Sequence, residues 1–218
     1  VKTFFGAGTL GDTYIIALKL MALGVEPVKI LHCTKHKYWH KEIKSIYSIL
    51  PNVEVEFVDK QPDGVVELTT DCHEQDMIFF PKLSINTSFT FKDEYIAIQP
   101  HAGKNKGNNK EIEASSILHA IKNINGNFII LGTKEKYKTI QADNTINLIG
   151  KTSILAAMSI VAKAKECICP EGLLAFVALS QRKRSNVLYA SKMAIERRII
   201  GTPWEQYCNF INAQMRKG

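Results

Sequence analysis

A carboxylate stands directly behind a glycine turn near the start of the chain, in the segment GAGTLGD from Gly6 to Asp12. The segment follows a short apolar run and precedes an apolar stretch with helical spacing, so it is expected to join a strand to a helix. A carboxylate on such a turn, at the carboxyl end of a strand, faces the crevice where open α/β sheets bind ligands. Asp12 is therefore suited to act as a general base that deprotonates an acceptor hydroxyl.

The same segment allows two other interpretations. Asp12 fits a helix N-cap, because its side-chain oxygen can accept a hydrogen bond from an unpaired amide. The spacing G-x-G-x-x-G is also typical of dinucleotide-binding turns, in which a pyrophosphate rests on the helix N-terminus. Asp12 would compete with that pyrophosphate, and Lys35, His36 and Lys37 stand where an acidic residue would hold the ribose. An NAD(P)-dependent oxidoreductase is therefore the weaker alternative.

The elements that position this turn follow from the alternation of apolar runs along the chain. Strands alternate with helices of about 10 to 15 residues, which is typical of parallel, doubly wound sheets. The polar, aperiodic segment 81–94 separates two such series. We expect an α/β fold of two small Rossmann-like units with parallel sheets facing a cleft, at residues 1–85 and 95–218. The last element is expected to be a helix over 204–215, and its packing back on the N-terminal unit is one option.

Composition and charge narrow the class of partner. The 218 residues carry a net charge of +7 and are 45% hydrophobic, as expected for a globular protein with an anionic partner. No apolar run approaches the roughly 20 residues that span a bilayer, and no signal peptide is recognised at the N-terminus. Five scattered cysteines are interpreted as reduced thiols, which predicts a cytoplasmic location. His32, His36 and His40 lack a further acidic or cysteine ligand nearby, so no metal is expected.

Aromatic and basic side chains mix between residues 35 and 41. Tyr38 and Trp39 beside three lysines could stack on nucleic acid bases. The spacing of Trp39, Ile43 and Ile46 instead favours the apolar face of an outer helix, so no nucleic acid partner is expected. Basic residues at 182–184 and 197–198 are interpreted as solvated loops, with contact to a nucleotide as the alternative.

Segments in both halves of the chain resemble the heptosyltransferase-like glycosyltransferases of family 9. GTLGD with its following apolar helix is similar to the opening of that family, and YIAIQPHAG, NFIILGTKEKY and NLIGKTSIL are similar to its later strands and turns. The similarity extends over nearly the whole chain. It implies a GT-B fold whose C-terminal unit binds a nucleotide-sugar donor. It also implies that the Asp after the glycine turn, here Asp12, is the base for the acceptor hydroxyl.

The resemblance implies a lysine on the donor diphosphate, and its nearest match in this chain is Lys110. Lys104 and Lys106 belong to the same basic loop and could supply the same charge, or the loop could simply be solvated.

The turn at Gly172 departs from the family pattern. Aligned on this glycine, Pro170, Glu171 and Ala175 replace the family's Asp, hydroxyl residue and His. A glycine turn at a helix N-terminus can still bind phosphate through backbone amides. Glu171 either holds ribose hydroxyls or caps the helix that begins at Leu173.

We therefore predict a metal-independent glycosyltransferase without a cofactor. It would move a hexosyl or heptosyl group from a nucleoside-diphosphate sugar to a glycan, glycolipid or other hydroxyl acceptor, with peripheral membrane contact as an option. A non-catalytic nucleotide- or glycan-binding relative is the main alternative. The predicted donor-binding residues are Gly11, Lys104, Lys106, Lys110, Gly132, Gly150, Glu171, Gly172 and Leu173.

Overall fold

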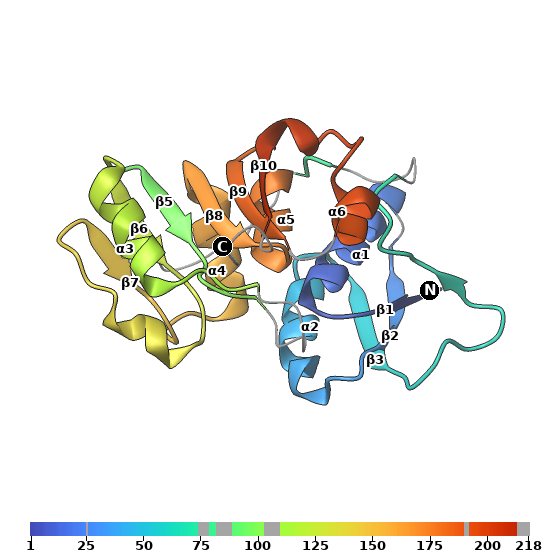
Figure 1. Cartoon of the computed structure of the whole chain (residues 1–218). Coiled ribbons are helices and arrows are strands. Elements are labelled where there is room, and N and C mark those ends of the chain that lie inside the picture. Colours follow the sequence, from blue (N-terminus) through green and yellow to red (C-terminus); the bar gives the residue numbers. More distant parts are fainter. Residues whose placement is uncertain (25, 74–78, 82–88, 103–109, 190–191, 213–218) are drawn as a thin grey trace.

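The computed structural model describes residues 1–24, 26–73, 79–81, 89–102, 110–189 and 192–212. The N-terminal part forms sheet A, whose strands are parallel and run in the order β3-β2-β1-β4 (Figure 1). Its strands are β1 (Lys2–Ala7), β2 (Val28–Cys33), β3 (Val53–Phe57) and β4 (Val66–Glu67). Its helices are α1 (Leu10–Leu23), the short 3₁₀ helix η1 (Lys37–Trp39) and α2 (His40–Tyr47).

The C-terminal part forms sheet B, which is also parallel and has the order β10-β9-β8-β5-β6-β7. Its strands are β5 (Tyr95–Ile98), β6 (Asn127–Ile130), β7 (Thr145–Asn147), β8 (Glu166–Pro170), β9 (Arg184–Tyr189) and β10 (Cys208–Asn212). Its helices are α3 (Ala114–Asn123), η2 (Glu135–Thr139), α4 (Ile154–Lys163), α5 (Leu173–Ser180), α6 (Lys192–Arg198) and η3 (Glu205–Tyr207).

Two parallel-sheet α/β units confirm the predicted fold class. Sheet A draws on residues 2–67 and sheet B on residues 95–212, on either side of the predicted linker. The domain limits 1–85 and 95–218 stay predictions. No helix within the described part of the chain is long and apolar enough to cross a membrane.

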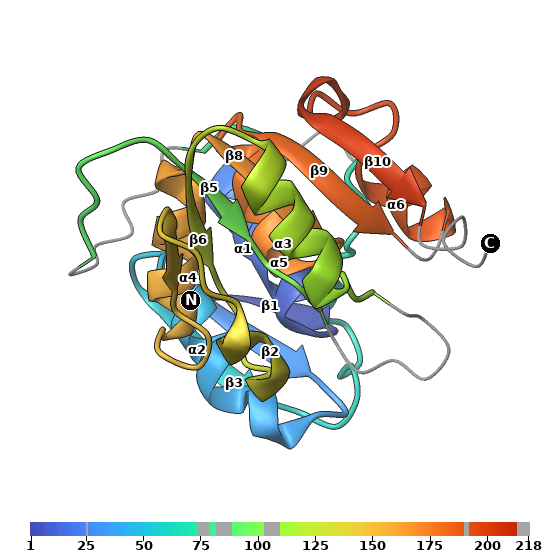
Figure 2. The ribbon, with the colours of Figure 1, turned by 60° about the vertical axis from the view of Figure 1, so that its left-hand side comes forward.

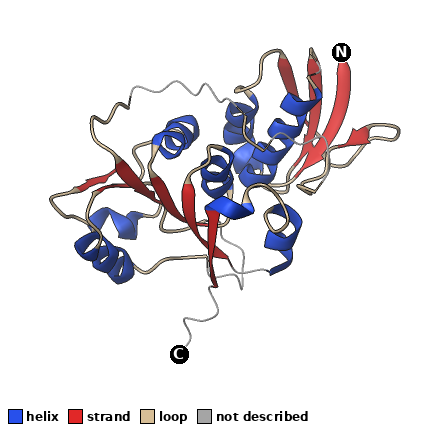
Figure 3. Ribbon diagram, turned by 90° about the horizontal axis from the view of Figure 1, so that it is seen from above, coloured by secondary structure: helices blue, strands red, loops and turns tan. Residues whose placement is uncertain are grey.

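Helices from both units lie between the two sheets (Figure 3). Helix α5 is apolar around its whole circumference, and all its residues are buried, because it packs between sheet B and helices α1 and α4. The Tyr14 hydroxyl of α1 lies 2.7 Å from Ser180 Oγ of α5, so one buried hydrogen bond joins the units. Helix α3 covers the opposite face of sheet B, with a second apolar cluster beneath it (Figure 2).

The predicted terminal helix over 204–215 is wrong. Cys208–Asn212 is strand β10, which pairs in parallel with β9. Phe210 and Ile211 face opposite sides of the sheet, Phe210 toward the α5 cluster and Ile211 toward the α3 cluster. This alternation has the period of a strand, and pairing with β9 satisfies the backbone groups. Helix α6, which the sequence did not predict, makes a further contact with the N-terminal unit: the carbonyl of Arg197 accepts a hydrogen bond of 3.0 Å from the amide of Cys72.

Candidate active site

Each sheet has one point at which the strand order reverses. In sheet A, β2 and β3 lie on one side of β1 and β4 lies on the other. In sheet B the reversal falls between β5 and β8. Ligands of open α/β sheets bind at the carboxyl edge beside such a reversal. The chain leaves β1 into the Gly8–Asp12 turn, and it leaves β8 into Glu171 and Gly172, so the predicted residues stand at both points.

The glycines of the N-terminal turn are explained by close contacts. Gly8 has φ of 127°, and a Cβ atom there would overlap the carboxylate of Asp12. A Cβ on Gly6 would approach Cδ1 of Ile16 to 2.8 Å. A Cβ on Gly11 would lie 3.3 Å from the backbone nitrogen of Leu173. The first turn of α1 therefore packs against the first turn of α5, and Gly11 lies next to Gly172 and Leu173.

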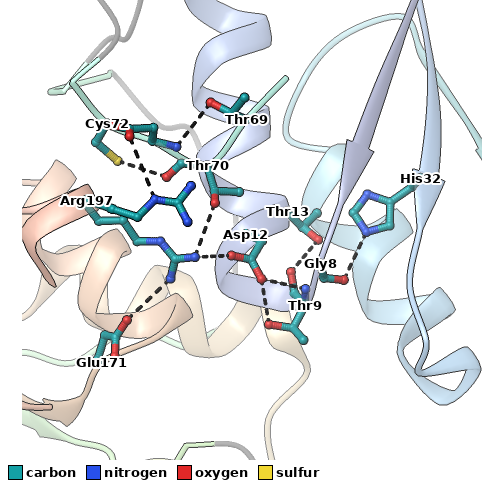
Figure 4. A network of polar contacts seen from close by, with 12 residues as sticks. Gly8, Thr9, Asp12, Thr13, His32, Thr69, Thr70, Cys72, Glu171 and Arg197 are labelled. Atoms are coloured by element: carbon teal, nitrogen blue, oxygen red, sulfur yellow. Dashed lines mark hydrogen bonds and ion pairs between the residues drawn. The ribbon is translucent and has the colours of Figure 1, made fainter. Parts of the chain in front are cut away.

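Asp12 is not the N-cap of α1 that one interpretation of the sequence expected, and its role as a base stays a prediction. Thr9 is the N-cap of α1, and Asp12, three residues later, accepts hydrogen bonds at Oδ2 from the Thr9 amide (2.8 Å) and hydroxyl (3.1 Å; Figure 4). This is the second half of a capping box. Oδ1 is not used by the cap and points away from the α1 terminus toward the C-terminal unit.

Arg198, at the end of α6, contacts Asp12 Oδ1. Its Nη2 lies 2.6 Å from that oxygen and 3.3 Å from the hydroxyl of Thr70, which follows β4. Its Nη1 lies 3.4 Å from Oε1 of Glu171. One guanidinium thus joins the reversal point of sheet A to that of sheet B. The prediction of a solvated loop at 197–198 is wrong for Arg198, whose side chain is only 20% exposed, whereas Arg197 is half-exposed.

Glu171 is the buried member of this network. Its side chain is 2% exposed, and Oε2 accepts a bond of 2.8 Å from Nζ of Lys110. The predicted lysine and the predicted glutamate are therefore brought together across the β5–β8 reversal. Figure 4 shows Glu171 at the lower left of the network and Asp12 near its centre. Gly172, with φ of 150°, is the N-cap of α5 and provides no side-chain cap. Within the described residues Glu171 forms ion pairs, and the predicted helix cap is not observed.

The other predicted donor-binding residues lie elsewhere. Gly132 follows β6 and Gly150 follows β7, so both lie at the carboxyl edge of sheet B. The amide of Gly150 donates a 2.7 Å hydrogen bond to the carbonyl of Gly132. Lys104 and Lys106 fall outside the described residues.

His32 is a buried hydrogen-bond partner of the glycine turn. It is fully buried, with Nε2 3.3 Å from the carbonyl oxygen of Gly8 and Nδ1 3.0 Å from the hydroxyl of Tyr47. Nε2 donates to the carbonyl, so Nδ1 is the acceptor for Tyr47 in the neutral ring. Burial lowers the pKa of His32 below its ordinary value, against the opposing effects of the Gly8 bond and of the Asp12 charge.

Two other parts of the surface do not belong to this network. A groove of about 250 Å³ on the α3 side of sheet B is lined mainly by isoleucines, with no charged residue among its lining. Helix α2 is the outer helix that its spacing predicted, with Ile43 and Ile46 fully buried. Beside it, Tyr38 is 68% exposed between the exposed side chains of Lys37 and Lys41.

The described residues contain no group of three His, Cys, Asp or Glu side chains that could hold a metal ion. Metal independence stays a prediction.

Two parallel sheets with facing reversal points, a carboxylate on a glycine turn and cations at the second turn define an α/β protein of the GT-B-like class. No protein-family model matches the chain, and no curated protein matches it in sequence. Solved glycosyltransferases do match its fold. The family 9 glycosyltransferase of Veillonella parvula DSM 2008 is 10% identical with a TM-score of 0.66, over 98% of this chain and 86% of that one.

Two further structures have similar folds. ADP-heptose lipopolysaccharide heptosyltransferase II of E. coli is 12% identical with a TM-score of 0.56, over 97% of this chain and 90% of its own. TibC, an iron-containing dodecameric glycosyltransferase from enterotoxigenic E. coli H10407, is 13% identical with a TM-score of 0.56, over 97% of this chain and 62% of its own. This chain therefore has the fold of the family 9 glycosyltransferases along nearly its whole length.

Proposed function

We propose that this protein is a glycosyltransferase that moves a sugar from a nucleoside-diphosphate sugar to a hydroxyl acceptor, with Asp12 as the general base. One observation carries the proposal. Asp12 Oδ1 faces away from its capping bonds and toward the Glu171–Gly172 turn, where the two sheet reversals meet. A hydroxyl bound at this position would lie between a base and a donor.

The leaving diphosphate would lie against the first turn of α5. Gly172, the partly exposed N-cap, stands at the positive end of that helix, and such a terminus favours an anion. Lys110 and Arg198 both contact Glu171, next to this turn, so two cations lie beside it. Electrostatic stabilisation of developing negative charge is a large contribution in group transfer. Lys104 and Lys106 stay proposed ligands of the diphosphate. Gly132 and Gly150 would line the path of the nucleoside along the sheet edge.

The reaction would be a direct exchange of bonds at the anomeric carbon. The acceptor hydroxyl gives its proton to Asp12 Oδ1 while its oxygen forms the bond to that carbon. The bond from the carbon to the diphosphate oxygen breaks, and the nucleoside diphosphate leaves with the electron pair. The step requires neither a redox cofactor nor a metal. Because TibC contains iron, transfer should be measured with and without a chelator, and we expect no loss.

The names of the similar structures suggest the donor and acceptor classes. One acts with ADP-heptose on lipopolysaccharide, according to its description, so a hexosyl or heptosyl donor and a glycan or glycolipid acceptor are proposed for this chain. The exposed Tyr38, with the exposed Lys37 and Lys41 near it in the sequence, lies in η1 after β2, at the same sheet edge as the Asp12 turn. An aromatic ring among cations suits the headgroup region of an anionic membrane, where a glycolipid acceptor would be found.

The geometry disfavours the oxidoreductase alternative. A dinucleotide pyrophosphate needs the free amides at the start of α1, but Asp12 occupies the Thr9 amide and Gly11 packs against Leu173. A non-catalytic binding protein keeps one supporting observation: Ala175, at the family's His position, is fully buried and offers no polar group.

Titration calorimetry with ADP, GDP, UDP, CDP and NADPH tests the class. We expect at least one nucleoside diphosphate to bind with a dissociation constant below about 1 mM, a free energy of about 4 kcal/mol. Tight binding of NADPH together with no binding of any nucleoside diphosphate would overturn the proposal.

A further inference from the structure

Arg198 has no counterpart in the donor-site residues that the sequence predicted. Its guanidinium holds Asp12 Oδ1 at 2.6 Å and Glu171 Oε1 at 3.4 Å, and it stacks over the ring of Phe176 with 5.7 Å between the cation and the ring centre. The side chain is four-fifths buried. A cation so placed is not a surface charge.

This contact partly occupies the proposed base. Oδ2 of Asp12 accepts from the Thr9 amide and hydroxyl, and Oδ1 accepts from Arg198. A general base must offer an oxygen to the proton that it removes, within hydrogen-bond reach. In the arrangement observed, an acceptor hydroxyl would have to share Oδ1 with the guanidinium of Arg198, which already pairs with this carboxylate.

The two cations next to the N-terminus of α5 also form ion pairs with carboxylates. Arg198 is paired with two carboxylates, and Lys110 is paired with the buried Glu171. The four charges of this network, two positive and two negative, sum to zero. A diphosphate arriving at the Gly172 turn would add negative charge, and it would compete with Asp12 for the guanidinium. Arginine binds phosphate oxygens in a two-pronged geometry that a single carboxylate oxygen does not match.

We propose that Arg198 is a diphosphate-binding residue that blocks Asp12 until the donor is bound. Binding of the diphosphate draws the guanidinium from Asp12 Oδ1 and so exposes the base to the acceptor. Donor therefore binds before acceptor, and Glu171 keeps Lys110 and Arg198 close to the turn. The inference rests on the proposed function for the identity of the diphosphate as part of a sugar donor.

The first test uses inorganic pyrophosphate as the probe, in calorimetry at constant ionic strength. Arg198→Gln should weaken its binding about 10- to 100-fold, the range expected for loss of a charged hydrogen bond. Arg197→Gln is the matched control, because Arg197 is adjacent, half-exposed and 3.9 Å from Asp71; it should change binding less than about twofold. Equal effects of the two substitutions, or no binding of pyrophosphate to the unaltered protein, would overturn the proposal.

The second test does not require an Arg198 variant to fold. Asp12→Asn removes the charge that competes for Arg198 and keeps the shape of the side chain, so pyrophosphate should bind about 3- to 30-fold more tightly, as for coupled neighbours. In the double variant Asp12→Asn/Arg198→Gln this gain should disappear. A gain that persists in the Arg198→Gln background means that Asp12 merely repels the anion, and it contradicts the proposal, as does unchanged or weaker binding in Asp12→Asn alone.

The outcomes separate this inference from the proposed function. Arg198-dependent binding of pyrophosphate, with no binding of nucleoside diphosphates and no sugar transfer, would support the inference and overturn the proposed function. Sugar transfer at an unaltered rate in Arg198→Gln would support the proposed function and overturn the inference.

Discussion

The carboxylate of Asp12 fills the space that a side chain on Gly8 would need. A Cβ atom on Gly8 would overlap Oδ2 of Asp12 and lie within 2.6 Å of its carboxyl carbon. The glycine is thus required by the carboxylate of Asp12, four residues later in the chain, and not by a bound dinucleotide. This relationship explains why a glycine motif and an acidic residue occur together in this chain.

Replacing Gly8 by alanine should therefore displace Asp12. We expect Gly8→Ala to reduce sugar transfer by at least about 100-fold, the lower range for loss of a general base, and to destabilise the protein by about 1–3 kcal/mol through its φ of 127°. Gly126→Ala is the control, because Gly126 has φ of 151° with open space around it. It should destabilise the fold and leave transfer intact. Transfer by Gly8→Ala equal to that of the control would refute the relationship.

Gly11→Ala tests the contact between the two glycine turns. Alanine in place of glycine inside a helix normally stabilises a protein by about 1 kcal/mol. Here the added Cβ would lie 3.2 Å from Cε2 of Phe176 and 3.3 Å from the amide nitrogen of Leu173, so we expect a net loss of about 1–2 kcal/mol. Urea unfolding measures the change. A gain in stability would show that α1 and α5 do not approach so closely.

Protonation of His32 should weaken the fold. Its pKa is lower in the folded protein than its ordinary value of 6.5, mainly because the ring is buried. The unfolded state therefore takes up a proton first, and stability present above pH 6.5 is lost as the pH falls below it, by at most about 1.4 kcal/mol per pH unit.

Unfolding free energies at pH 7.5 and 5.5 check this sign. His32→Gln should reduce the loss between the two pH values, whereas His119→Gln, at an exposed position, should not. An identical loss in the unaltered protein and in His32→Gln would assign the pH dependence to other groups.

Local signals allowed much of the fold to be predicted from the sequence. The glycine turn and the apolar spacing after it predicted α1, and the alternation of strands and helices predicted two parallel sheets. Strand β10 was missed because Trp204, Tyr207, Cys208 and Ile211 also fit a helical stripe. Only pairing with β9, which is a tertiary contact, decides between the two periods.

The site was predicted only in part, for a related reason. Asp12 and Glu171 stand on turns with recognisable chemistry. Both lie where the strand order of their sheet reverses. Arg198 has no local signal, because its partners are 186 and 27 positions away in the chain. An arginine pair at the end of a short helix is usually solvated, and only the packing of α6 against the N-terminal unit brings Arg198 into the network.

The most direct test of the proposed function is the rate of sugar transfer by Asp12→Asn. Pooled sugar nucleotides and hydroxyl acceptors would be incubated with the unaltered protein and with the variant, and released nucleoside diphosphate would be measured. We predict release by the unaltered protein that depends on acceptor, and a rate at least about 100-fold lower in Asp12→Asn, with donor binding at least as tight. Transfer by Asp12→Asn at the original rate would show that Asp12 is only a helix cap, and would contradict its role as the base.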